Sequence, residues 1–279
     1  MKHTIMTLTI LALVAAAFSA PLAGKDAKKS SRGLQETEVN QQTYQVGKNA
    51  RLSLSNLNGA VTVTGWDKNE FEVTITKRAG SREQLDDANV IVDFNDDDLH
   101  IEVEYDFDND GEEDETVTFD GDDLVDVDFE IRAPRHAEIR RIELVNGGVK
   151  ISDLTGEVNA ASVNGNVTGE SLSGETHLST VNGNVKLSKL TKHDEIELSS
   201  VNGSVTLYLP KNVNAKLTAS TVHGDIRGDL GHGVTHAGSS MDAVLGTGGP
   251  RIELGTVNGN IRIRRADSDQ RDDSDDDSD

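Results

Sequence analysis

Apolar and polar residues alternate along most of the chain, as at Leu52 and Leu54 in the stretch RLSLSNLN. A period of two places successive side chains on opposite faces of a strand, so the pattern predicts β-strands with one buried face. Helical periodicity is nearly absent, apart from a short helical turn expected around residues 83–88. The sequence therefore predicts an all-β domain over residues 44–266.

A five-residue word built on Asn-Gly recurs throughout this domain. Its copies are Val145–Val149, Val163–Val167, Val181–Val185, Val201–Val205 and Val257–Ile261, with looser copies at Leu57–Val61 and Val222–Ile226. From Asn146 to His223, which takes the asparagine place in its word, the steps are 18, 18, 20 and 21 residues, and a step of 35 leads to Asn258. A period of about 20 residues is typical of solenoid repeats.

Two architectures fit a word that lies between two short alternating strands. Asn-Gly is a strong hairpin signal, and hairpins in series would give an antiparallel meander. That meander would leave one wholly apolar face, and the chain offers no amphipathic helix to cover it. It would also place Val181 and its equivalents on the face opposite to that of Leu178 and Thr180. A parallel β-solenoid (β-helix or β-roll), with rungs of 18–21 residues facing each other across a thin core, is therefore favoured. The antiparallel hairpin meander remains the alternative.

In a solenoid the repeated word marks a corner. Gly supplies a backbone conformation with positive φ, and asparagines stacked above one another can satisfy each other's amides. We expect a structural ladder of corner residues at Asn146, Asn164, Asn182, Asn202 and Asn258.

These repeats resemble a known bacterial family. The Thr/Ser-Val-Asn-Gly-Asn-Val words and the stretch GGPRIELGTVNGNIRI at residues 248–263 are similar to the "putative adhesin" domains of unknown function, which are related to the head-GIN-domain autotransporter adhesins. The likeness covers residues 44–264. It implies an exported, repetitive β-solenoid without catalysis, and it supplies no catalytic residue. This chain departs from the family by an acidic insertion and an acidic tail.

The N-terminus predicts export. One Lys precedes an apolar run over residues 5–18, and small residues follow it, which is the pattern of a secretory signal peptide. We expect a signal peptide at 1–19, then a polar linker at 20–43. The run is short for a membrane span and no second run exists, so no transmembrane segment is expected in the mature protein. The chain has no Cys and therefore no disulfide.

The net charge of −22 comes from two segments. An acidic insertion at 93–130 has 19 Asp and Glu with no Lys or Arg, and a tail at 267–279, expected to be disordered, has 8 Asp and one Arg. Because nucleic-acid binding needs a basic patch, nucleic acid is not expected as a partner.

The acidic insertion contains a candidate calcium site. Asp106, Asp108 and Asp110 alternate and are followed by Gly111, which matches the first half of a calcium loop. The twelfth position, where a bidentate Glu belongs, is Val117. A solvated acidic hairpin loop that condenses cations loosely is the simpler interpretation.

The leading hypothesis is an exported, non-enzymatic adhesion or scaffold protein of the bacterial envelope. A flat face of Ser, Thr, Asn and Lys would bind a glycan or protein surface, and the protein would be periplasmic, on the cell surface or secreted. The alternative is a calcium-binding envelope stress protein whose acidic segments do the work. A polysaccharide-active enzyme is less favoured, because no nucleophile motif or carboxylate pair with defined geometry emerges.

Overall fold

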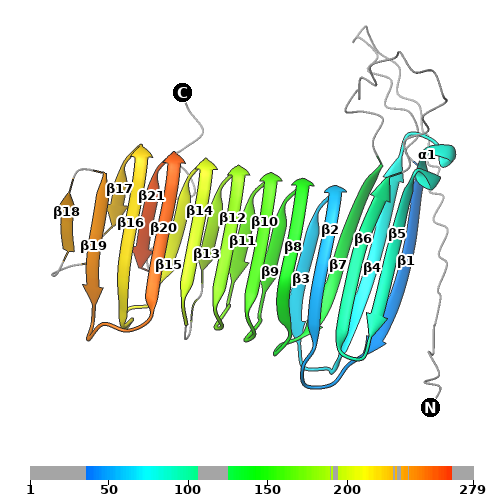
Figure 1. Cartoon of the computed structure of the whole chain (residues 1–279), viewed down its shortest axis with the longest axis horizontal. Coiled ribbons are helices and arrows are strands. Elements are labelled where there is room, and N and C mark those ends of the chain that lie inside the picture. Colours follow the sequence, from blue (N-terminus) through cyan, green and yellow to red (C-terminus); the bar gives the residue numbers. More distant parts are fainter. Residues whose placement is uncertain are drawn as a thin grey trace, which may run out of the picture.

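Two large β-sheets lie face to face and form a long stack (Figure 1). The computed structural model describes residues 36–105, 125–188, 190, 194–228, 230, 234–237 and 239–265. The all-β prediction is confirmed, and the expected helical turn is α1 (Arg82–Asp86), which begins after Ser81, whose Oγ accepts a hydrogen bond from the backbone N–H of Gln84 at 3.2 Å.

One sheet has eleven strands. In spatial order they are β18 (Val234–Ala237), β19 (Ser240–Leu245), β16 (Ala215–His223), β20 (Arg251–Asn258), β14 (Ile196–Asn202), β12 (Thr176–Asn182), β10 (Val158–Asn164), β8 (Glu138–Asn146), β2 (Arg51–Asn58), β6 (Asp98–Tyr105) and β5 (Ala88–Asn95).

The other sheet has ten strands. In spatial order they are β1 (Glu36–Gln45), β4 (Glu70–Ala79), β7 (Asp126–Pro134), β3 (Val61–Trp66), β9 (Val149–Ser152), β11 (Val167–Glu170), β13 (Val185–Ser188), β15 (Val205–Leu209), β21 (Ile261–Arg265) and β17 (Ile226–Gly228).

Each Asn-Gly word joins a strand of one sheet to a strand of the other, as between β12 and β13. We call such a strand pair with its corner a coil. Neighbouring coils pair in parallel and in register, with Leu178 opposite Leu198 in one sheet and Val185 opposite Val205 in the other. The word therefore does not form a hairpin, because its two strands pair with neighbouring coils and not with each other.

The two ends of the stack depart from a purely parallel solenoid. β1, β4 and β7 pair antiparallel, as do β5 with β6, β16 with β19, and β18 with β19. The sheets are therefore mixed, and the expectation of parallel rungs throughout was too simple. Hairpins at both ends give the chain the reversals that it needs to change direction along the stack.

The coils are also not stacked in sequence order. The last coil, β20 and β21, lies between the coil of β14 and β15 and the coil of β16 and β17. The 35-residue step from His223 to Asn258 contains the β18–β19 hairpin, after which the chain returns and β20 pairs between β16 and β14. At the other end, β2 and β3 lie between β8 and β9 on one side and β6 and β7 on the other.

Two expected boundaries differ from the strands. Residues 36–43 were assigned to a polar linker but belong to β1, because pairing with β4 satisfies the backbone of this mostly polar strand. Parts of the acidic insertion at 93–130 also belong to strands β5, β6 and β7. The expected signal peptide and acidic tail lie outside the described residues.

The core is a thin layer between the sheets. The alternating residues on either side of the corner word are buried, including Ile142, Leu144, Leu178, Leu198 and Leu254 before it and Val149, Val185, Val205 and Ile261 after it. Leu154, Leu172 and Leu190, which follow the second strand of their coils, are buried at the far edge of the same layer. Aliphatic side chains therefore hold the sheets together, and the outward positions are free for other roles.

Candidate functional site

The expected corner residues meet in one ladder of side-chain amides. Nδ2 of Asn164 donates to Oδ1 of Asn146 at 2.9 Å, and Nδ2 of Asn182 donates to Oδ1 of Asn164 at 2.8 Å. Asn202 and Asn258 continue the ladder at 2.9 Å each. His223 takes the next place opposite Asn258, and its carbonyl accepts the backbone N–H of Gly259. The ladder ties each coil to the next at the surface of the corner.

A buried hydroxyl lies two residues before the corner residue in five of the words, four of which have Asn and one His223 at the corner. Thr180 Oγ1 donates to the carbonyl of Gly165 at 2.8 Å, and Ser200 Oγ donates to the carbonyl of Gly183 at 2.9 Å. The same contact is made by Ser162, Thr256 and Thr221. These bonds explain why Ser or Thr precedes Val-Asn-Gly, since a buried carbonyl needs a donor.

The corner glycines are required mainly by close packing between coils. A Cβ on Gly183 would lie 2.2 Å from the carbonyl oxygen of Gly165, and one on Gly203 would lie 1.8 Å from that of Gly183. Positive φ, the expected reason, holds for Gly147 and Gly203 but not for Gly165 or Gly183, which lie outside the left-handed range. The explanation from φ was therefore incomplete, because stacked corners leave no room for a side chain.

The coil of β6 and β7 has a different corner. The hydroxyl of Tyr105 donates to Oδ1 of Asn56 at 3.1 Å, and burial raises the pKa of Tyr105 to about 12. Asp126 Oδ1 accepts from Nδ2 of Asn58 at 2.6 Å, and Asp128 Oδ1 accepts from the backbone N–H of Ala60 at 2.8 Å. Residues 106–124, where other coils have Asn-Gly, are outside the described residues, and so are the proposed calcium ligands Asp106, Asp108 and Asp110.

The outer face of the eleven-stranded sheet has a row of exposed valines. The valine before each ladder asparagine points outward and is between 37% and 40% exposed, and Val222 before His223 is 64% exposed. We call this the valine row, and its members are Val145, Val163, Val181, Val201, Val257 and Val222. Across six strands at a spacing of about 4.8 Å, the row is about 24 Å long.

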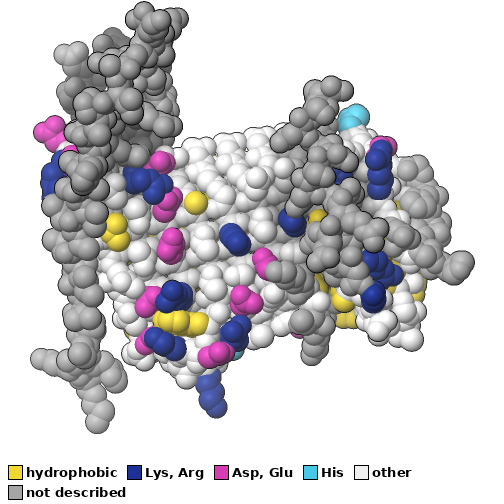
Figure 2. Space-filling model, turned by 180° about the vertical axis from the view of Figure 1, so that it is seen from behind, with side chains coloured by type: hydrophobic (Ala, Val, Ile, Leu, Met, Phe, Trp, Pro, Cys, Tyr) yellow, Lys and Arg dark blue, Asp and Glu magenta, His cyan; other side chains and the backbone are white. Residues whose placement is uncertain are grey.

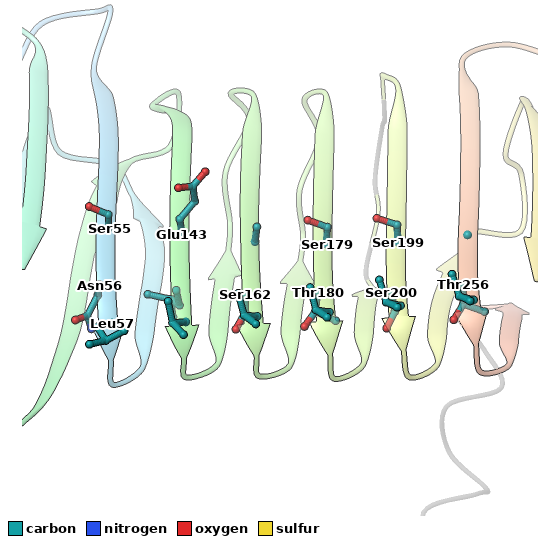
Figure 3. Close-up of a pocket in the computed structure, with 18 of the residues that line it drawn as sticks. Ser55, Asn56, Leu57, Glu143, Ser162, Ser179, Thr180, Ser199, Ser200 and Thr256 are labelled. Atoms are coloured by element: carbon teal, nitrogen blue, oxygen red, sulfur yellow. The ribbon is translucent and has the colours of Figure 1, made fainter. Parts of the chain in front are cut away.

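A second row runs beside it. Its members lie two residues before each valine and are mostly small: Glu143, Ala161, Ser179, Ser199, Gly255 and Ser220. Together the two rows line an open groove of about 910 Å³, which we call the valine groove (Figure 3). Figure 3 shows Ser179 and Ser199 side by side on neighbouring strands, with Thr180 and Ser200 nearer the corner.

The groove is apolar and nearly uncharged. Among its described lining residues, Glu143 is the single charged group, and none is aromatic or basic. Lys150 and Lys186 lie instead on the ten-stranded sheet, in a row with Thr168 and Thr206. Figure 2, which shows the molecule from behind, has Lys and Arg interspersed with Asp and Glu. The expected single face of Ser, Thr, Asn and Lys is therefore divided between two faces.

The outward phase of Val181 and its equivalents was counted against the hairpin meander, but the observed coils also place these valines on the outer face, so that argument did not distinguish the two architectures and the valine row was missed as a surface feature. Thr180 and Leu178 share the inward phase of β12, so Val181 between Thr180 and the corner must point outward. In the described part of the chain, no three His, Asp or Glu residues are grouped so that they could hold a metal ion. None of the described helices is long and apolar enough to cross a membrane.

The fold and its open groove define a repetitive β-protein with an extended, open outer face. The chain belongs to the Toastrack DUF4097 family, whose model matches residues 22–264. The family resemblance inferred from the Asn-Gly words is thereby confirmed.

Two solved structures are similar to this chain. One is described as a "putative cell adhesion protein" from Clostridium sporogenes, with 15% identity and a TM-score of 0.48, covering 82% of this chain and all of that one. The other is a "putative adhesin" from Bacteroides fragilis, with 15% identity and a TM-score of 0.41, covering 81% of this chain and 96% of that one. No curated protein matches the chain.

Proposed function

We propose that the protein is a non-enzymatic adhesion or scaffold protein of the bacterial envelope that holds a macromolecular partner in the valine groove. The observation that supports this most directly is the valine row, in register over six neighbouring strands. A regular apolar row on a solvent-facing sheet is the kind of patch that marks an interaction site. Export to the envelope is part of the proposal and rests on the N-terminal sequence.

The shape of the groove favours a long partner over a small molecule. Small-molecule sites are usually concave and enclose most of the ligand, whereas this groove is open and runs across neighbouring strands from β2 to β16. The absence of aromatic and basic groups from its described lining favours aliphatic and neutral polar contacts over sugar stacking or phosphate binding. We therefore favour a protein surface over a glycan.

The test is binding of the labelled mature chain, from residue 20 onward, to cell envelopes of the source bacterium. The informative variant is the triple Val163→Thr, Val181→Thr and Val201→Thr, because Thr keeps the β-branched shape and replaces a methyl group by a hydroxyl. We expect saturable binding by the native chain and at least about tenfold weaker binding by this variant.

The matched control makes the reverse exchange on the opposite sheet, at Thr62→Val, Thr168→Val and Thr206→Val. It changes the same number of outward side chains and is expected to bind like the native chain. Absence of saturable binding, or equal loss in both triple variants, would overturn the assignment of the groove.

A further inference from the structure

We propose that the partner of the valine groove is the valine groove of a second copy of this chain. This inference rests on the proposed function, since it names the occupant of the same binding face. The observation behind it is that the two rows of the groove are complementary to each other.

The valine row is a ridge and the small-residue row beside it is a trough. Val163, Val181 and Val201 project from the sheet, and the residues two positions earlier are Ala161, Ser179 and Ser199. Positions two residues apart on one strand, such as Ala161 and Val163, are about 6.7 Å apart on the same face. A valine side chain of a facing molecule therefore fits over the small residue, next to the native valine.

A two-fold axis brings the rows together. The axis runs perpendicular to the strands, between the outer faces of the two copies and midway between the valine row and the small-residue row. With this axis, the valine row of each copy lies over the small-residue row of the other. Each coil then faces the equivalent coil, so Val163 of one copy meets Ala161 of its partner. The spacing matches without adjustment because both copies have the same repeat, and the contact is isologous.

The charge distribution permits this contact. The net charge of −22 comes from the acidic insertion and the acidic tail, so it does not argue against contact between two grooves. Glu143 is the one charged residue among the described lining of the groove, and its Oε1 lies 3.6 Å from Nε of Arg141 on the same chain. Arg141 thus lowers the repulsion between the two Glu143 side chains.

The area is sufficient for a specific dimer. The stack of coils is about 30 Å long, and along the strands the outer face is about 20 Å wide, from the row of His177 and Glu197 to the corner. Two copies that meet over this face bury on the order of 1,200 Å² in total. That value is at the lower end of specific interfaces. The outward residues His177 and Glu197 then face the asparagine ladder of the partner and supply a polar rim.

The first experiment is sedimentation velocity of the mature chain over a wide range of concentrations. We expect reversible dimerisation, weakened at least about tenfold in the triple Val163→Thr, Val181→Thr, Val201→Thr variant and unchanged in the Thr62, Thr168, Thr206→Val control. A native chain that stays monomeric at every concentration would overturn the inference. If such a monomer still bound envelopes through the groove, the proposed function would stand and the partner would be another molecule.

The second experiment tests the register. Because the chain has no Cys, single cysteines can be introduced without interference. A mixture of the Ala161→Cys and Val163→Cys variants should form a disulfide-linked dimer under mild oxidation. A mixture of Ala161→Cys with Val201→Cys, which lies two coils away, should not. Equal cross-linking in both mixtures would overturn the two-fold arrangement even if the chain dimerises.

Discussion

Each residue of the corner word makes a different contact between coils. In the word that contains Asn182, Thr180 donates a buried hydrogen bond, Val181 faces solvent, Asn182 extends the amide ladder and Gly183 permits close approach. The contacts of Thr180, Asn182 and Gly183 join neighbouring coils through hydrogen bonds or close packing. The outward valine is the residue of the word on which the proposed binding face rests.

We expect Thr180→Val to lower the free energy of unfolding by about 1–3 kcal/mol, because valine keeps the shape but leaves the carbonyl of Gly165 without its hydroxyl donor. Urea denaturation measures the change. Ser179→Ala, one residue earlier on the outer face, is the control and should change stability by less than about 0.5 kcal/mol. Similar losses in the two variants would show that the buried hydroxyl has no special role.

Gly183→Ala should lower the free energy of unfolding by about 3 kcal/mol, because its Cβ would lie 2.2 Å from a backbone oxygen that cannot move without shifting a coil. Gly255→Ala is the matched control, since no atom lies within 4 Å of the Cβ it would add. Thermal unfolding of both variants compares them directly. Equal melting temperatures would refute the role of close approach.

At the scale of elements, neighbouring strands are also joined on the outer face by charged side chains. His177 on β12 lies opposite Glu197 on β14, with Nδ1 3.4 Å from Oε2 of Glu197 and Nε2 2.9 Å from Oε1 of Glu175. Burial lowers the pKa of His177, but the hydrogen bonds to the two carboxylates outweigh it and the net pKa is raised. The protonated imidazole therefore stabilises the pairing of these strands.

This raised pKa predicts a pH dependence of stability. A histidine whose folded pKa exceeds its unfolded value stabilises fully below about pH 6.5, and the contribution is lost as the pH rises through the folded pKa. Urea unfolding of the native chain across this range should show the loss, and His177→Gln should remove that part of the slope. His223→Asn, which restores the asparagine of the ladder, should retain it. A slope that survives in His177→Gln would assign the pH dependence to other groups.

At the scale of the whole molecule, the order of coils differs from the order of the sequence. β20 and β21 are the last strands of the chain, yet they separate the coil of β14 and β15 from the coil of β16 and β17. Among the described residues, the region from β16 to β19 consequently has no direct strand pairing with the preceding coils. Its attachment depends on the final coil.

Truncation after Gly249 tests this dependence. Without β20 and β21, we expect β16–β19 to lose hydrogen-exchange protection while β8, β10 and β12 retain theirs, because the latter pair among themselves. Truncation after Arg265 keeps all described strands and is the control. Retained protection of β16 in the shorter chain would mean that this coil docks onto β14 without the last coil.

The sequence by itself determined the local pattern. The two-residue period specified which side chains are buried, as with Leu178 and Leu187, and the Asn-Gly spacing placed the corners, because these depend on neighbouring residues along the chain. It also brought Asn146 and Asn164 into the expected ladder, since an 18-residue repeat returns the chain to the same corner.

Only the tertiary structure decided the order of the coils, the antiparallel ends and the faces that result. The next word along the chain after Asn202 is Val222–Ile226, yet the word that stacks beside β14 is Val257–Ile261, so the order depends on packing between distant segments. The valine groove has the same origin: each valine is a local feature, but a continuous surface forms only when separate coils align in register.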